Sequence, residues 1–255
     1  MVAGRSGGGR WVRGYRRVPG GVSLVCFPHA GGAASYFRPW PALLAPGIEV
    51  LAVQYPGRED RAAEPCLTAV ADLADQIHAE LGRSLPGTFA FFGHSMGAIL
   101  AFEVARRIAR QEGRGPAHLF VSGRPAPPRR RHRDLHRAGD LALIAELAAL
   151  GGTDPRILAD SEVLELILPA MRGDYTASET YRFTPGPPLS CEITAMTGDR
   201  DWLSTVAEAA AWSAHTTGAF TLRVYPGGHF YLNDCRARVL EVISSSLAAS
   251  AASPS

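Results

Sequence analysis

The stretch FAFFGHSMGAILAFEVARR, residues 89–107, joins an apolar strand-like run directly to an apolar helix-like run. The junction is Gly93-His94-Ser95-Met96-Gly97, which fits the pattern G-x-S-x-G. Glycine on both sides allows close strand–helix packing and the unusual dihedral angles of a sharp turn. Because serine suits such a junction only if its hydroxyl has a task, the stretch predicts a nucleophile elbow, with Ser95 as the nucleophile. The alternative is a chance match in a chain with 27 glycines.

The rest of the chain alternates between strand-like and helix-like segments. Near-continuous apolar runs, typical of strands buried on both faces, occupy 22–28, 48–56, 88–94, 118–124, 191–198 and 220–227. Helical patterns lie at 35–45, 67–82, 96–112, 203–216 and 234–249. This alternation predicts an α/β fold in which helices cover both faces of a mostly parallel central sheet.

One long segment, at about 125–189, breaks the alternation. It holds two helical patterns, at 140–150 and 161–181, between stretches rich in proline and glycine. An insertion of this size is usually functional, and we expect a helical lid over a site. The alternative is two helices that only thicken the fold.

The composition is that of an ordinary globular protein, and 255 residues allow one α/β domain or two small ones. We expect a flexible leader over 1–20, one domain over 21–250 and a disordered tail over 251–255. The first residues contain arginine and glycine but no apolar core, so they do not resemble a secretory signal. The net charge of +2 gives no reason to expect a nucleic-acid or membrane partner. The four cysteines have no CxxC spacing, which predicts free thiols, no metal site and a cytoplasmic protein.

A nucleophilic serine needs a histidine base, and the base needs an acid to orient it. On a fold with a nucleophile elbow the chain order is serine, acid, histidine. Only His229, in YPGGHF, follows a predicted strand at its carboxyl end, where open α/β sheets place their sites. The other histidines after Ser95 begin a strand, lie in an arginine-rich loop or lie near a helix end: His118, His132, His136 and His215.

The acid should follow the fifth predicted strand, in CEITAMTGDRDWL. Two aspartates are available there. Asp199 directly follows Gly198 and could cap the turn, whereas Asp201 lies further along the loop, before the apolar pair Trp202-Leu203. We favour Asp201 as the acid and keep Asp199 as the alternative.

Two backbone N–H groups should face the reacting carbonyl as an oxyanion hole. One is that of Met96, which opens the helix after the nucleophile. The other should come from the loop after the first predicted strand, FPHAGGAASYF, and we predict the N–H of Ala30. His29 is expected to support this loop, with a catalytic part as the lesser alternative.

Five segments together resemble those of the type II thioesterases: VCFPHAGG, VLAVQYPGRED, FFGHSMGA, TGDRDWL and YPGGHFYL. These stand-alone α/β-hydrolases accompany polyketide synthases and non-ribosomal peptide synthetases of antibiotic biosynthesis. The resemblance covers about residues 20–248, and the combination of FPHAGG with GHSMG is its most specific part. It implies an α/β-hydrolase fold with a mobile helical lid. The matching site positions are Ser95, Asp201 and His229 for the triad, and Ala30 and Met96 for the oxyanion hole.

The resemblance also implies a substrate and partners. The family removes aberrant or stalled acyl groups from the phosphopantetheine arm of acyl or peptidyl carrier proteins. No metal or dissociable cofactor is then required, since the phosphopantetheine belongs to the carrier, and members are commonly monomers. The segment 129–137 is more basic than the family pattern leads us to expect. It could steer an acidic carrier protein, or the phosphate of the pantetheine arm, by long-range attraction, or it could be a solvated charged loop.

Two other functions fit the same residues. The chain could be a small-molecule carboxylesterase or lipase, which would be indifferent to a carrier protein. It could also be a non-catalytic hydrolase homologue that binds a carrier protein through the basic segment. Replacement of Ser95 separates the enzymes from the binding protein.

Overall fold

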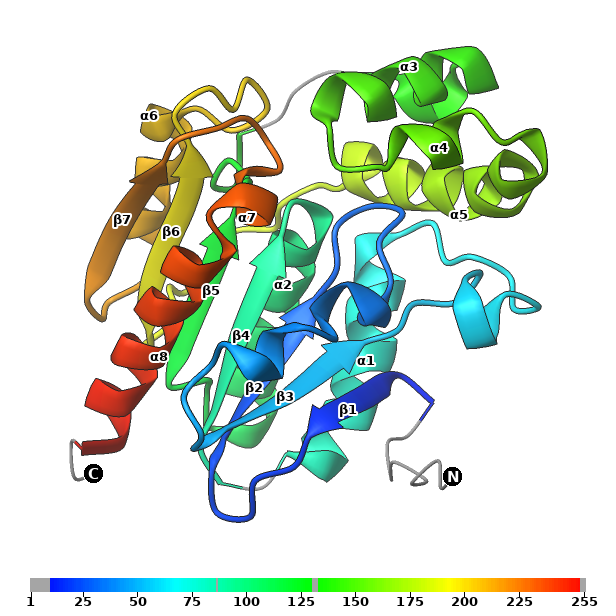
Figure 1. Ribbon diagram of the computed structural model, residues 1–255. Helices are drawn as coiled ribbons and strands as arrows, with labels where there is room; N and C mark the ends of the chain where they lie inside the picture. Colours follow the sequence, from blue (N-terminus) through cyan, green and yellow to red (C-terminus); the bar gives the residue numbers. More distant parts are fainter. Residues whose placement is uncertain (1–9, 86, 130–132, 253–255) are drawn as a thin grey trace.

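A seven-stranded sheet lies at the centre of the molecule (Figure 1). The computed structural model describes residues 10–85, 87–129 and 133–252. The strands lie in the order β1-β3-β2-β4-β5-β6-β7, and all neighbours are parallel except β1, which runs antiparallel to β3. Their bounds are β1 Val12–Arg16, β2 Val22–Phe27, β3 Ile48–Val53, β4 Phe89–His94, β5 His118–Ser122, β6 Glu192–Gly198 and β7 Phe220–Tyr225. The predicted α/β class is therefore confirmed.

Helices cover both faces of the sheet. On one face, α1 (Val70–Ser84) and α2 (Met96–Glu112) close one apolar core. On the other, α8 (Arg236–Ala252) and two short 3-10 turns, Ala34–Phe37 and Trp40–Ala42, close a second core. All residues of β4 and β5 are buried, which explains why these strands are continuously apolar in sequence. The remaining short elements are α6 Val206–Ala210, α7 Tyr231–Asp234 and the 3-10 turns Glu59–Arg61, Leu135–Arg137 and Ala211–His215.

The amino-terminal segment differs from the expectation. Residues 12–16 form β1, so the flexible leader expected over 1–20 is wrong for this part, and residues 1–9 lie outside the described residues. Trp11 and Val12 are buried, and the C=O of Trp11 accepts a hydrogen bond from the N–H of Gln54 at 2.8 Å. The apolar burial and the pairing with β3 hold this strand in place.

Two other boundaries also differ. The helical pattern expected over 35–45 is two 3-10 turns, because Pro39 and Pro41 lack the N–H that a continuous helix needs. At the other end α8 continues to Ala252, so the expected tail over 251–255 is helical in its first two residues, and 253–255 lie outside the described residues. No helix of the described ranges is both long and apolar enough to cross a bilayer.

The segment 125–189, called the insertion from here on, contains helices in its described part, as expected. It contains α3 (Asp140–Leu150), α4 (Pro155–Leu158) and α5 (Ser161–Thr180). Aspartate side chains cap the starts of α4 and α5. Figure 1 shows these helices beyond the carboxyl ends of the central parallel strands. The insertion therefore lies over the edge of the sheet at which Ser95 is placed.

Candidate active site

Ser95 lies on a strained turn between β4 and α2. Its φ of 55° and ψ of −116° fall outside the regions that L-residues ordinarily adopt. A Cβ atom on Gly97 would lie 2.0 Å from the carbonyl oxygen of Phe27, and one on Gly93 would lie 2.1 Å from that of Gly97. Both positions need glycine, because neither backbone contact can give way. The turn thus has the form of the predicted nucleophile elbow.

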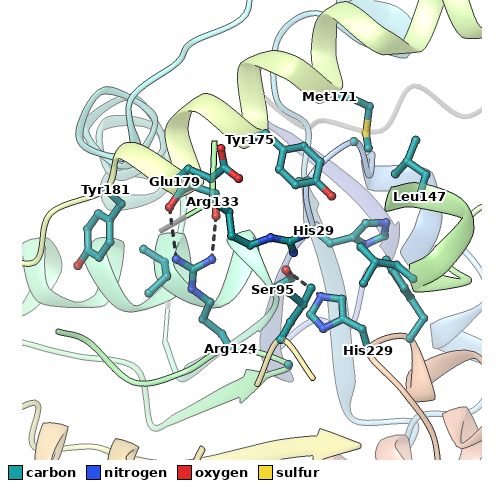
Figure 2. Close-up of a pocket in the computed structure, with 18 of the residues that line it drawn as sticks. His29, Ser95, Arg124, Arg133, Leu147, Met171, Tyr175, Glu179, Tyr181 and His229 are labelled. Atoms are coloured by element: carbon teal, nitrogen blue, oxygen red, sulfur yellow. Dashed lines mark hydrogen bonds between the residues drawn. The ribbon is translucent and has the colours of Figure 1, made fainter. Parts of the chain in front are cut away.

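The structure brings the side chains of Ser95, His229 and Asp201 together (Figure 2 shows the first two). The Oγ atom of Ser95 lies 3.0 Å from Nε2 of His229. Nδ1 of the same ring lies 2.9 Å from Oδ2 of Asp201. His229 and Asp201 are both buried. A hydroxyl, an imidazole and a carboxylate in this sequence form the arrangement by which a buried acid orients a base toward a nucleophile.

The two aspartates in the loop after β6 have different hydrogen-bond partners. Oδ1 of Asp201 accepts hydrogen bonds from the N–H groups of Leu203 at 2.9 Å and Ser204 at 3.2 Å, which leaves Oδ2 for the imidazole. Asp199 instead accepts the N–H of Gly227 at 2.9 Å. Asp199 therefore binds the backbone of the loop after β7, whereas Asp201 contacts His229.

The two predicted oxyanion donors lie beside the serine. Met96 is the first residue of α2, so its N–H lies at the positive end of the helix dipole. Ala30 and Ser95 line the same cavity. Within the described part of the chain, neither N–H has a protein hydrogen-bond acceptor. Neither N–H is therefore already committed to another acceptor in the described part of the chain.

The model of the thioesterase domain family matches residues 22–247, nearly the whole chain. The chain belongs to the thioesterase family. Thioesterase PikA5 of Streptomyces venezuelae is 50% identical over 228 residues, which are 89% of this chain and 81% of that protein.

Solved structures agree with this assignment. The type II thioesterase BorB from the borrelidin biosynthetic cluster has a TM-score of 0.89 and 48% identity, covering 95% of this chain and 100% of its own. The RedJ thioesterase from the prodiginine biosynthetic pathway of Streptomyces coelicolor has a TM-score of 0.84 and 39% identity. The match covers 88% of this chain and 85% of RedJ. The resemblance stated from the motifs is confirmed. The sheet has the α/β-hydrolase fold, and the thioesterase is a hydrolase that acts on thioester bonds.

Two further histidines of the thioesterase pack around His229. The ring of His94 lies 4.9 Å from that of His229, and the ring of His29 lies 5.9 Å from that of His94. Burial lowers the pKa of His29 to about 3 and lowers the pKa of His94 well below its usual value. Both rings are therefore neutral at neutral pH and add no positive charge beside an imidazolium at His229. His29 also meets Tyr36 and Phe230 edge to face, which fits the expected supporting role.

A cavity of about 280 Å³ lies in front of Ser95, between the sheet edge and the insertion (Figure 2). Most of its wall is apolar, and the side chains there include Ile99, Leu147, Ile167, Met171 and Phe183. Polar groups gather on one part of the wall, including Arg124, Ser178, Glu179 and Tyr181. An apolar chamber with a few polar groups suits an acyl chain.

Arg124 is a pocket residue that the sequence reasoning missed. It follows the carboxyl end of β5, and its guanidinium donates to Oγ of Ser178 at 2.7 Å, which ties the sheet edge to α5. Burial lowers the pKa of Arg124 to about 10, so the group remains charged at neutral pH. In the sequence, only its position at the end of a predicted buried strand indicates that Arg124 could lie at the site.

Several side chains of the basic segment 129–137 pair with glutamates of the same molecule. Arg133 forms a bidentate pair with Glu146 at 2.6 and 2.7 Å. Arg129 pairs with Glu208 at 3.0 Å, and His136 lies 2.5 Å from Glu179. These pairs connect the basic segment to α3, α5 and α6. Residues 130–132, including the candidate His132, lie outside the described residues.

Neither His118 nor His215 contacts Ser95 in the structure. His118 contacts Thr194 in the sheet, and His215 contacts the C=O of Pro127. In the described ranges, no group of three or more His, Cys, Asp or Glu side chains is placed to hold a metal ion.

Proposed function

We propose that this thioesterase hydrolyses acyl thioesters on the phosphopantetheine arm of acyl or peptidyl carrier proteins, and so removes aberrant or stalled acyl groups in polyketide or peptide biosynthesis. The observation that carries the proposal is the contact chain from Ser95 through His229 to Asp201 at the floor of an apolar chamber. The similarity to the type II thioesterase of a biosynthetic cluster supports the carrier-bound substrate. A cytoplasmic monomer is part of the same proposal.

Acylation of Ser95 begins with proton transfer. Nε2 of His229 takes the hydroxyl proton as Oγ attacks the thioester carbonyl, and Asp201 holds the ring and stabilises its charged form. The N–H groups of Ala30 and Met96 stabilise the oxyanion, and the loss of one such donor typically costs about 10²- to 10³-fold in rate. The imidazolium then protonates the departing pantetheine thiol, which leaves an acyl-serine.

Deacylation uses the same groups in reverse. His229 takes a proton from a water molecule, which attacks the acyl-serine carbonyl, and the oxyanion again faces the two N–H groups. The imidazolium returns its proton to Oγ of Ser95, and the free acid leaves. Every proton in this scheme moves between substrate, water and side chains of the chain, so the scheme needs no metal or dissociable cofactor.

The first test replaces the nucleophile. We expect Ser95→Ala to lower kcat for acyl-carrier protein by about 10⁵- to 10⁶-fold with its unfolding midpoint close to that of the parent, because only the attacking oxygen is lost. Mass spectrometry of carrier proteins loaded with short and long acyl groups measures the loss directly. Equal hydrolysis by the parent and by Ser95→Ala would rule out catalysis by this serine.

The second test addresses the partner. The same acyl group is offered on a carrier protein, on coenzyme A and as an oxygen ester. We expect the carrier protein to be the preferred substrate by kcat/KM. If the oxygen ester were turned over as well as the carrier-bound thioester, the chain would be a general esterase.

A further inference from the structure

An aspartate of the insertion reaches the backbone of the loop that carries Ala30. The N–H of Gly31, the residue after Ala30, donates to Oδ2 of Asp174 at 2.7 Å. Asp174 lies on α5 and is 1% exposed, and 143 residues separate it from Gly31. A buried carboxylate of the insertion thus holds the amide next to a proposed oxyanion donor.

The local backbone explains why this contact concerns catalysis. The N–H of Gly32 donates to the C=O of His29 at 2.9 Å, and Gly31 has a φ of 74°, so residues 29–32 form a type II turn. In a trans peptide the N–H points away from the C=O of the same peptide unit. Because the C=O of His29 points into the turn, the N–H of Ala30 points out of it. The orientation of the turn therefore sets the direction of this oxyanion donor.

Arg58 holds Asp174 and the turn at once. Its Nη1 atom donates to Oδ2 of Asp174 at 2.6 Å and to the C=O of Gly32 at 3.0 Å, and its Nη2 atom donates to Oδ1 at 2.8 Å. Arg58 is 8% exposed. The turn is therefore held at two points, the N–H of Gly31 and the C=O of Gly32, by one buried ion pair.

Side-chain packing adds a further link between α5 and the turn. A Cβ atom on Gly31 would lie 1.7 Å from Sδ of Met171, one helical turn before Asp174. A side chain at position 31 would therefore have to displace Met171, and the φ of 74° would strain the backbone as well. A displacement of α5 would remove both the carboxylate and the packing surface from the turn.

We propose that Asp174, held by Arg58, is a positioning residue that couples the place of α5 to the orientation of the Ala30 N–H, so that the oxyanion hole is complete only when the insertion is seated on the turn. This inference rests on the proposed function, because it assumes that the Ala30 N–H stabilises the oxyanion. Asp174 itself contacts neither Ser95 nor His229 in the structure.

The test compares two double variants that bury no unpaired charge. Arg58→Met/Asp174→Asn keeps an oxygen that can accept the Gly31 N–H, whereas Arg58→Met/Asp174→Leu removes it. Removing one partner alone would leave a buried charge and destabilise the fold, so both charges are replaced together. The substrate is an octanoyl thioester of N-acetylcysteamine, which needs no carrier protein.

We expect kcat of the Asn double variant to exceed that of the Leu double variant by about 10-fold or more, with KM within about 2-fold, because the lost group acts on the transition state. A trifluoromethyl ketone that adds to Ser95 mimics the tetrahedral intermediate. Its Ki should differ between the two variants by the same factor as kcat. Urea unfolding checks that both variants are folded.

Arg172→Ala is the matched control on the same helix. Arg172 donates to the C=O groups of His136 and Ala138 at 2.8 and 2.7 Å and to Asp140 at 2.6 Å, all within the insertion. We expect kcat of this variant to stay within about 3-fold of the parent, since none of these contacts touches the turn. A loss of kcat as large as that of the Leu double variant would mean that any loosening of the insertion has this effect, and the inference would be wrong.

Two further outcomes separate the inference from the proposed function. If the trifluoromethyl ketone binds the parent but has equal Ki values in the two double variants, only the positioning role is overturned. If Ser95→Ala is as active as the parent, the proposed function fails first. Should the double variants not fold, Asp174→Glu keeps the charge opposite Arg58 but displaces the acceptor, and an unchanged kcat for it would overturn the inference.

Discussion

At the scale of single residues, two aspartates two positions apart differ in their task because of the backbone between them. Asp201 accepts two N–H groups of its own loop and presents its free oxygen to His229, whereas Asp199 accepts the N–H of Gly227. These contacts hold the carboxylate of Asp201 beside Nδ1 of His229, where it can orient the ring and stabilise an imidazolium. Asp199 instead links two loops.

This difference gives a prediction at the residue scale. Asp201→Asn should lower kcat by about 10⁴-fold, because the amide cannot stabilise the charged ring and favours the wrong tautomer. Asp199→Asn should keep kcat within about 3-fold, since an amide oxygen can still accept the Gly227 N–H. Steady-state kinetics on an acyl thioester measures both variants. A larger loss for Asp199→Asn than for Asp201→Asn would reverse the assignment of the acid.

At the scale of elements, β1 shows how a strand can be hidden by its composition. The segment WVRGYRR has only three apolar or aromatic residues within an arginine- and glycine-rich stretch, and this composition predicts a leader. In the structure the ring of Trp11 lies under the guanidinium of Arg61 at 4.2 Å, and Val12 pairs with Val53 of β3. β1 is held in the sheet by contacts with residues about 40 to 50 positions away in the sequence. A local sequence pattern cannot predict such contacts.

The element-scale prediction concerns the anchoring of β1. Trp11→Ala should lower the free energy of unfolding by about 3–5 kcal/mol, because it removes a large buried side chain at 6% exposure. Arg17→Ala is the control, with a side chain that is 83% exposed, and should change the free energy by less than about 0.5 kcal/mol. Urea unfolding measures both. Equal effects of the two variants would mean that β1 contributes little to the fold.

At the scale of the whole molecule, the sequence predicted what depends on local pattern and on motif. Apolar runs predicted six of the seven strands, and the placement of Ser95 and His229 after strands predicted the edge at which they meet. The contacts of Asp174, Arg58 and Arg124 were missed. Each depends on how the insertion folds back over the sheet, and charged residues in loops and on helices give no local sign of burial.

Packing keeps three histidines in neutral form, of which His94 and His118 are buried and His29 is half-buried. His29 and His94 lie beside the candidate site, and His118 lies at the start of β5, where it stacks on Phe120 at 4.1 Å. Burial lowers the pKa of His118 to about 4 and that of His29 to about 3, and it lowers the pKa of His94 well below its usual value. The carboxylate of Glu192 lies 3.6 Å from His118 but is more than half exposed. Water therefore screens its attraction for a charged His118 ring.

These histidines predict how stability depends on pH. In the unfolded chain each ring takes a proton near pH 6.5. In the folded chain the pKa is about 4 for His118 and about 3 for His29, and that of His94 is well below its usual value. Below pH 6.5 the unfolded state therefore binds more protons, and the free energy of unfolding falls as pH falls, by up to about 4 kcal/mol per pH unit for three rings. Urea unfolding at pH 7, 6 and 5 measures the slope. His118→Gln keeps a hydrogen bond to Thr194 but cannot titrate, so it should reduce the slope by about a third. An unchanged slope would show that His118 takes up its proton equally readily in the folded and unfolded states.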